Sequence, residues 1–249
     1  MKNLCIFILV SLLFLPNASF PQNAKQVINK YFSLVSKNGK RKDWQEIKTI
    51  HIESKGYFIK DFEMDRPIYQ KGRYLKSMEE QTVVKGLTTS KFYKIWPYFE
   101  RWETYWGDTL YATFHVNREG TIYERVNGVR RELGNSLNFE FYSVKLINDL
   151  KKGKLKKSAE KVTKDGKDYI KVDISMTKGI YSYYFDFKNN LLEYITHNGI
   201  WTRLEEYKEI EGFLIPMHTS ISANGPKYYD NRRYIVDINP PIDSLGFSF

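Results

Sequence analysis

The sequence contains a single cysteine, Cys5, in 249 residues. That cysteine lies within the apolar run from Leu4 to Leu15. An acylated lipoprotein carries its cysteine directly after such a run, so we expect no lipid anchor. A chain with one thiol cannot form an internal disulfide or a thiolate metal site. Its stability therefore depends on a packed core, for which the length is sufficient.

The sequence also lacks a long apolar segment. The run from Leu4 to Leu15 falls short of the roughly 20 apolar residues that a membrane-spanning helix needs. It follows Lys2 and precedes small residues such as Ala18, which is the layout of a secretory signal peptide. We expect residues 1–23 to be this signal peptide, cleaved between positions 18 and 24, and residues 24–249 to form one domain; an uncleaved anchor or a buried helix is the alternative. The expected location is the periplasm, with the outer-membrane surface or the medium as alternatives.

No motif of catalysis or cofactor binding occurs in the sequence. It has no G-x-x-x-x-G-K-[ST] loop, no G-x-G-x-x-G, no G-x-S-x-G nucleophile elbow and no H-E-x-x-H zinc motif. None of the four histidines has a second one at the spacing of a helical metal site: His51, His115, His197 and His218. The adjacent Glu205 and Glu206 would face opposite sides of a strand. The sequence therefore predicts no enzyme, no metal and no cofactor, with a hydrolase of unfamiliar type as a remote alternative.

Acidic residues are in the minority, with 29 Asp and Glu against 39 Lys and Arg and a net charge of +10. Removing the signal peptide takes away Lys2 and no acid, which leaves +9. The densest basic segment contains Lys151, Lys152, Lys154, Lys156 and Lys157. It predicts contact with an anionic membrane surface, worth about 1 kcal/mol per residue, or alternatively a solvated turn. Nucleic acid is not an expected partner, because no motif interleaves aromatic and basic residues.

Period-two alternation and turn residues dominate the C-terminal part of the chain. The predicted strands are 159–164, 169–177, 181–187, 191–197, 201–209, 213–222 and 228–238. Dipeptides such as Asp165-Gly166 and Asn198-Gly199 separate them, as expected for tight turns. Further strands are predicted at 68–78, 81–84, 110–117 and 121–125, and Asn127-Gly128 predicts a hairpin turn. Strands of similar length joined by tight turns indicate an antiparallel meander.

Apolar residues recur at helical spacing in residues 24–36 and 137–150, which we predict to be amphipathic helices. A third helix is predicted over residues 92–106, where large rings recur with a similar period and Pro97 fits a first turn. The candidate ligand-binding residues, as lining or gate of an apolar cavity, are Ile95, Trp96, Tyr98, Phe99, Trp102, Tyr105 and Trp106. The alternatives are an interfacial helix at lipid head-group depth and a helix that simply packs on the sheet.

These elements predict a mainly β fold with a few helices. A large antiparallel sheet usually packs one of its faces on another layer, and the amphipathic helices can supply that layer. We expect a curved antiparallel half-barrel with helices covering its concave mouth. Such a mouth commonly forms a ligand cavity.

Several stretches carry a family resemblance. They are Asp165-Gly166-Lys167-Asp168-Tyr169, Tyr183-Tyr184-Phe185-Asp186, the segments 189–193, 207–216 and 237–243, and the opening helix from Ala24 to Asn38. They resemble the outer-membrane lipoprotein carrier family, the LolA/LolB-like fold, and especially its lipoprotein-sorting relatives. The resemblance implies a half-open antiparallel barrel with helices inside its mouth. It also implies a hydrophobic cavity that shields acyl chains during transfer across the periplasm.

The function we expect is that of a monomeric periplasmic carrier that binds a lipid or an acylated lipoprotein in an apolar cavity. Burial of the acyl chains would supply the affinity, at about 0.8 kcal/mol per CH₂ group. The alternative is a non-enzymatic envelope interaction module without a small ligand.

Overall fold

The computed structural model describes residues 23–57, 88–96, 99–106, 108–116, 121–125, 130–132, 141–223 and 228–242. The expected signal peptide, apart from its last residue, lies outside these residues, as do the strands expected at 68–78 and 81–84. The described strands form one 14-stranded sheet in which every neighbouring pair is antiparallel.

The first half of the chain supplies six strands. They are β1 (Thr49–Tyr57), β2 (Thr88–Ile95), β3 (Phe99–Trp106), β4 (Thr109–Val116), β5 (Thr121–Arg125) and β6 (Arg130–Glu132). Strands β5 and β6 pair antiparallel, with Ile122 opposite Glu132. The turn predicted at Asn127-Gly128 lies outside the described residues.

The second half supplies eight strands. They are β7 (Lys154–Leu155), β8 (Glu160–Lys164), β9 (Lys167–Met176), β10 (Gly179–Asp186), β11 (Leu192–His197), β12 (Ile200–Ile210), β13 (Phe213–Ala223) and β14 (Tyr228–Ile238). The predicted meander is confirmed from β8 to β14. The turn Asp165-Gly166 has φ values of 51° and 76°, and Asn198-Gly199 has 50° and 78°. Two positive φ values are what a two-residue hairpin turn requires, so these dipeptides fix where the strands reverse.

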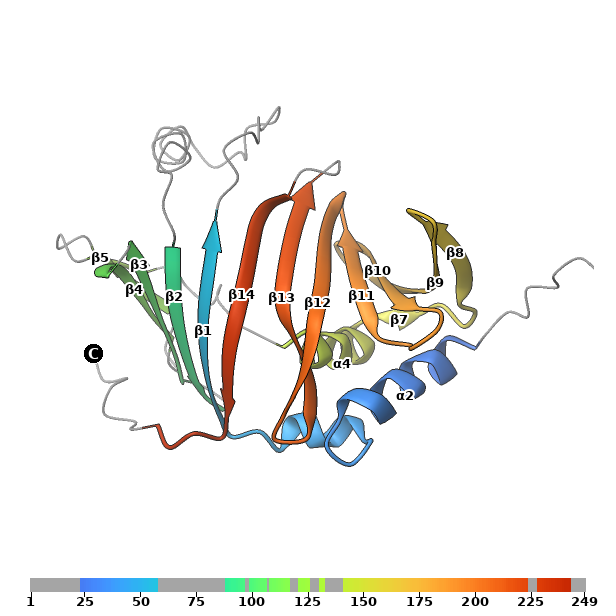
Figure 1. Cartoon of the computed structure of the whole chain (residues 1–249), viewed down its shortest axis with the longest axis horizontal. Coiled ribbons are helices and arrows are strands. Elements are labelled where there is room, and N and C mark those ends of the chain that lie inside the picture. Colours follow the sequence, from blue (N-terminus) through green and yellow to red (C-terminus); the bar gives the residue numbers. More distant parts are fainter. Residues whose placement is uncertain are drawn as a thin grey trace, which may run out of the picture.

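The sheet order is β6-β5-β4-β3-β2-β1-β14-β13-β12-β11-β10-β9-β7, with β8 paired to β9. The first strand therefore pairs with the last, and β1 and β14 join the two halves of the sheet. The sheet is open, because the described strands at its two ends do not pair with each other. Figure 1 shows the strands β9 to β13 curving over the helices, while β1 to β5 extend beyond them. The predicted half-barrel with helices at its concave face is confirmed.

Helix α2 (Ala24–Val35) is the opening helix that the sequence predicted. Its N-cap residue Asn23 accepts a hydrogen bond from the backbone N–H of Lys25 at 2.9 Å, which satisfies one of the free donors of the first turn. The helix buries one face against the sheet: Ala24, Val27, Ile28, Tyr31, Phe32 and Val35. The Tyr31 ring meets Phe185 of β10 edge-on, with 5.3 Å between centroids.

A 3-10 helix, η1 (Arg41–Gln45), follows α2, and helix α4 (Tyr142–Lys152) lies beside η1 and β9. The helix predicted over residues 137–150 is confirmed from Tyr142 onward, and residues 137–140 lie outside the described part. A hydrogen bond holds α4 on the sheet, because Asp149 accepts from Tyr183 of β10. Lys145 of the same helix also donates to Asp149. No helix in the described ranges is long and apolar enough to cross a membrane.

The prediction of a helix over residues 92–106 is wrong, because this segment forms β2 and β3. The two strands pair antiparallel, with Phe92 opposite Trp102. Aromatic and β-branched residues favour a pleated, half-buried surface. Pro97 falls in the sequence between the ranges of β2 and β3 and lies outside the described residues. Short apolar segments fit both periods, so spacing alone could not decide between helix and strand.

Candidate functional site

A small apolar pocket lies between the helices and the middle of the sheet. Its volume is about 40 Å³. Residues from η1, the start of α4 and strands β1, β13 and β14 form its wall: Trp44, Ile52, Phe141, Tyr142, Ser143, Ile215, Pro216, Tyr234 and Val236. The pocket therefore sits where the covered part of the sheet meets the part that extends past the helices.

Trp44 is the largest wall residue and is almost fully buried, with 2% of its surface exposed. Its ring meets Phe213 at 4.9 Å and Phe141 at 5.6 Å, both edge-on. Its indole N–H donates to Ser36 Oγ at 3.0 Å. Packing and this hydrogen bond fix the ring, so Trp44 limits the volume of the pocket.

A polar contact at the start of α4 joins the pocket wall to α2. Tyr31 Oη and Ser143 Oγ are 2.8 Å apart, and both residues are buried. Burial raises the pKa of Tyr31 to about 12, although its hydrogen bonds to Ser143 and Tyr207 oppose this shift. Tyr31 is therefore a neutral phenol that links α2 to the rim of the pocket.

An apolar row crosses five strands on the same face of the sheet. Consecutive members are paired in register: Val236, Ile52, Phe92, Trp102 and Phe114. Phe92 and Trp102 pack edge-on with 4.9 Å between ring centroids. Val236 and Ile52 are also pocket residues, so the row extends the apolar wall of the pocket onto β2, β3 and β4.

Polar rows flank this apolar row on both sides. On one side the register places Tyr234, Ser54, Ser90 and Thr104 next to one another, and Tyr234 Oη lies 2.7 Å from Thr219 Oγ1. On the other side Lys94 of β2 and Glu100 of β3 form a buried ion pair. The Lys94 ammonium also lies 4.8 Å from the centroid of the Trp96 ring. The concave face thus carries a narrow apolar strip between polar borders.

The candidate residues of β2 and β3 separate onto two faces. Trp96 and Trp102 pack against the hydrophobic core. Tyr105 lies on the opposite face, where its hydroxyl donates to Glu103 at 2.7 Å and the Lys91 ammonium lies 5.3 Å from its ring. By strand alternation, Ile95 and Phe99, which are paired in register, share that opposite face. Tyr98 and the side chain of Trp106 lie outside the described residues.

The lysine segment surrounds β7 at the end of α4. Its five lysines are all exposed. Lys156 forms ion pairs with Glu160 and Asp173. Lys151, Lys152, Lys154 and Lys157 have no acidic partner among the described residues. Most of the segment is thus uncompensated positive charge.

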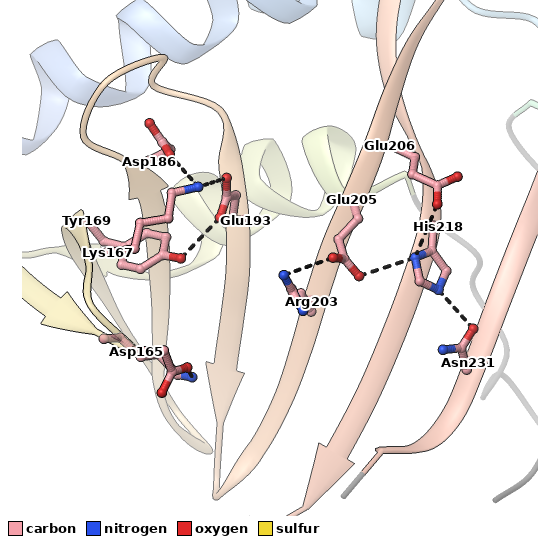
Figure 2. A network of polar contacts seen from close by, with 11 residues as sticks. Asp165, Lys167, Tyr169, Asp186, Glu193, Arg203, Glu205, Glu206, His218 and Asn231 are labelled. Atoms are coloured by element: carbon pink, nitrogen blue, oxygen red, sulfur yellow. Dashed lines mark hydrogen bonds and ion pairs between the residues drawn. The ribbon is translucent and has the colours of Figure 1, made fainter. Parts of the chain in front are cut away.

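The outer face of the sheet carries a polar network, which Figure 2 shows with the helices behind the strands. Lys167 pairs with Asp186 and Glu193, and Tyr169 donates to Glu193 at 3.1 Å. Separately, the two ring nitrogens of His218 lie 3.2 Å from a Glu205 oxygen and 2.8 Å from Asn231 Oδ1. Within the described ranges no group of histidines and carboxylates has the geometry of a metal site. The network ties neighbouring strands together.

Sequence reasoning missed the pocket residues, above all Trp44, Phe141 and Tyr234. They come from three segments far apart in the chain, so no periodicity links them. The only local signal is that Trp44 and Ile47 are large apolar residues in a strongly basic stretch. Both are buried.

An open, curved antiparallel sheet with helices on its concave face defines a half-barrel fold. Solved structures share this fold. A DUF1329 family protein from Desulfovibrio piger is 8% identical over 91% of this chain and 98% of its own, with a TM-score of 0.55. A domain from Vibrio parahaemolyticus described as outer-membrane lipoprotein-sorting is 10% identical over 90% and 97%, with a TM-score of 0.53. A LolA superfamily protein from Nitrosomonas europaea is 8% identical over 92% and 98%, also at 0.53.

These likenesses confirm, at the level of the fold, the resemblance inferred from the sequence. No family model and no curated protein matches the chain.

Proposed function

We propose that the protein is an envelope carrier that shields the acyl chains of a lipid or of an acylated lipoprotein. The observation that carries the proposal is the apolar row on the concave face, which leads from Phe114 and Trp102 into the pocket at Ile52 and Val236. An elongated apolar strip suits an acyl chain, whose burial supplies about 0.8 kcal/mol per CH₂ group. The similarity in fold to LolA superfamily proteins supports the same function.

Within this proposal, Trp96 and Trp102 line the binding surface. Trp106 and Tyr98 stay candidates on sequence grounds, whereas Ile95, Phe99 and Tyr105 would act only at its edge, since they face the other way. The lysine segment 151–157 would approach anionic head groups. The protein would act in the periplasm, and the proposal includes no catalytic step.

Native mass spectrometry of the exported protein, followed by lipid extraction, tests the proposal. A stoichiometric adduct that yields phospholipid or acylated peptide is expected. Replacing Trp102 with alanine should lower lipid retention about ten-fold, a loss of about 1.4 kcal/mol. Trp201→Ala is the matched control, because Trp201 is also a half-buried strand tryptophan and packs on Tyr184 of the outer face at 5.5 Å. Equal retention in both folded variants would refute the assignment.

A second candidate function is an envelope interaction module without a small ligand. The size of the pocket favours it, because about 40 Å³ is far below the roughly 300–1,000 Å³ of ordinary ligand sites. An unliganded mass that stays unchanged after incubation with liposomes would support this module against the carrier.

A further inference from the structure

Helix α2 carries an exposed basic surface that the carrier function does not explain. Its exposed residues include Lys25, Lys30 and Leu34, and the exposed Lys37 follows its C-cap residue Ser36. None of these three lysines has an ion-pair partner among the residues that the structure describes. Figure 1 shows α2 along the lower right border of the molecule, where no described strand covers its outer side.

The surface of α2 continues into the lysine segment. The backbone N–H of Ala24 donates to the carbonyl oxygen of Lys157 at 3.0 Å, and Asn23 forms a β-bridge with Ser158. The first turn of α2 therefore touches the end of the lysine segment. We define the basic face as the exposed residues Lys25, Lys30, Leu34, Lys37, Lys151, Lys152, Lys154 and Lys157.

Acidic residues compensate part of the charge in this region: Glu160 and Asp173 pair with Lys156, which lies between Lys154 and Lys157. Asp149 on α4 is buried and engaged by Lys145 and Tyr183. Glu211 is exposed in the β12–β13 turn, which approaches Lys37 at Gly212. Seven ammonium groups of the basic face, none with an ion-pair partner among the described residues, create a positive potential that attracts a polyanion.

Leu34 indicates which polyanion fits. It is 46% exposed, one of few large apolar side chains so exposed among the described residues. Lys30 lies four residues before it and is its neighbour on the helix surface, and Lys37 follows just beyond the C-cap residue Ser36. A bilayer presents anionic head groups above apolar chains, which matches lysines surrounding one leucine.

We infer that the basic face of α2 and the lysine segment is a docking surface for an anionic lipid bilayer, with Leu34 entering the interface. Head-group contacts of exposed lysines are screened by salt, and a single leucine adds little anchoring. The docking is therefore weak and reversible. It places the pocket beside the membrane, because Tyr31 of α2 is hydrogen-bonded to Ser143 of the pocket wall. The inference rests on the proposed function only for the identity of the lipid cargo that would pass between the pocket and the bilayer. Docking itself requires no cargo.

Vesicle co-sedimentation of the exported protein tests the docking surface, with phosphatidylcholine vesicles that contain or lack phosphatidylglycerol. Binding is expected only to the anionic vesicles, and it should be lost at about 1 M salt, where the Debye length is about 3 Å. Lys30→Gln with Lys37→Gln should weaken binding about five-fold per lysine, so about 25-fold together. Leu34→Gln should weaken it about three- to ten-fold.

The control is Lys55→Gln with Arg233→Gln, which removes the same formal charge from exposed neighbours on the outer face of β1 and β14, where Glu53 and Glu206 are their ion-pair partners. This variant should bind anionic vesicles within about two-fold of the parent, as expected for charges beyond a Debye length of about 10 Å. An equal loss in the control and in the α2 variant would overturn the inference, because net charge alone would then explain binding.

Two other results would also overturn it. One is binding to heparin without binding to anionic vesicles, which would assign the surface to a soluble polyanion. The other is that the Lys30→Gln, Lys37→Gln variant binds vesicles fully, whereas replacing Lys151 and Lys152 abolishes binding. That result would exclude α2 from the docking surface. Vesicle binding by a protein that never yields a lipid adduct would support docking while the carrier function failed, so the two proposals are tested separately.

Discussion

Trp44 links the stability of the fold to the volume of the pocket, so its removal has two measurable effects. The Trp44→Ala variant loses a buried indole that packs on Phe141 and Phe213 and donates to Ser36. Truncating a buried Trp costs about 3–5 kcal/mol. That is a large part of the about 5–15 kcal/mol that stabilises a typical domain. At about 2–4 °C per kcal/mol for a domain of this size, Tm should fall by about 6–20 °C.

Urea unfolding followed by circular dichroism measures the loss, with Trp44→Phe as the partial variant. Phenylalanine keeps most of the ring but leaves Ser36 Oγ without its donor, which should cost about 1–3 kcal/mol. The alanine variant should also bind benzene, because an apolar cavity stays dry and admits small apolar molecules. Benzene should therefore raise its Tm more than that of the parent. A loss below about 1 kcal/mol, with no response to benzene, would refute the packing described for Trp44.

Two predictions concern pH. Because burial raises the pKa of Tyr31 to about 12, the stability that its neutral form contributes is complete below pH 10 and falls as the pH rises toward 12, by about 2–3 kcal/mol. Urea titrations at about pH 9 and 11 should show this fall reduced in Tyr31→Phe; an unchanged fall would count against Tyr31 as its source. Burial opposes the ionisation of Asp186, but the Lys167 ammonium and two backbone N–H groups outweigh it and lower the pKa of Asp186. The stability that ionised Asp186 contributes is complete above the ordinary carboxyl pKa and is lost as the pH falls through its lowered pKa. The Asp186→Asn variant should therefore lose about 1–3 kcal/mol of unfolding free energy at pH 7 and clearly less near pH 3. An equal cost at both pH values in urea titrations would contradict the ion pair.

The strands of the second half were predictable because their boundaries are encoded locally. The turns Asp165-Gly166, Asn198-Gly199 and Glu211-Gly212 all place two successive residues at positive φ. Glycine reaches this region without strain, and Asn and Asp reach it more easily than other residues. Each such dipeptide therefore ends one strand and sets the register of the next. Alternation between the turns then decides which side chains face the helices.

The segment from Phe92 to Trp106 was not predictable from spacing, because its rings fit two periods. Phe92 and Trp102 are ten residues apart, yet they are direct cross-strand neighbours in the hairpin. The decisive fact is that β2 pairs with β1 on its other side, with Ile52 opposite Phe92. That contact is tertiary. A sequence shows the composition of such a row, but only the pairing shows which rings share a face.

Only the lysine segment of the basic face was predicted from the sequence, because the rest of the face depends on a tertiary contact. The lysine segment is dense in sequence and was identified as a candidate membrane contact. For helix α2, the sequence predicted only the buried apolar side. Its lysines are spaced too widely to form a cluster in the sequence. The hydrogen bond from Ala24 to Lys157 brings the two parts together across more than a hundred residues of chain. Surface charge becomes a site only through such contacts.

The small pocket restricts which ligands a carrier of this form could hold. About 40 Å³ admits only a few water molecules, so an acyl chain requires the start of α4 to move away from the sheet. The contacts that oppose this movement include the hydrogen bond between Tyr31 and Ser143 and the packing of Trp44 on Phe141. A hydrogen bond contributes about 1 kcal/mol net and an aromatic pair about 0.5–1.5 kcal/mol. Burying three CH₂ groups, at about 0.8 kcal/mol each, offsets both. In the proposed carrier, short apolar molecules would therefore gain too little to break these two contacts, whereas a long acyl chain would gain more, so a closed pocket would favour long chains.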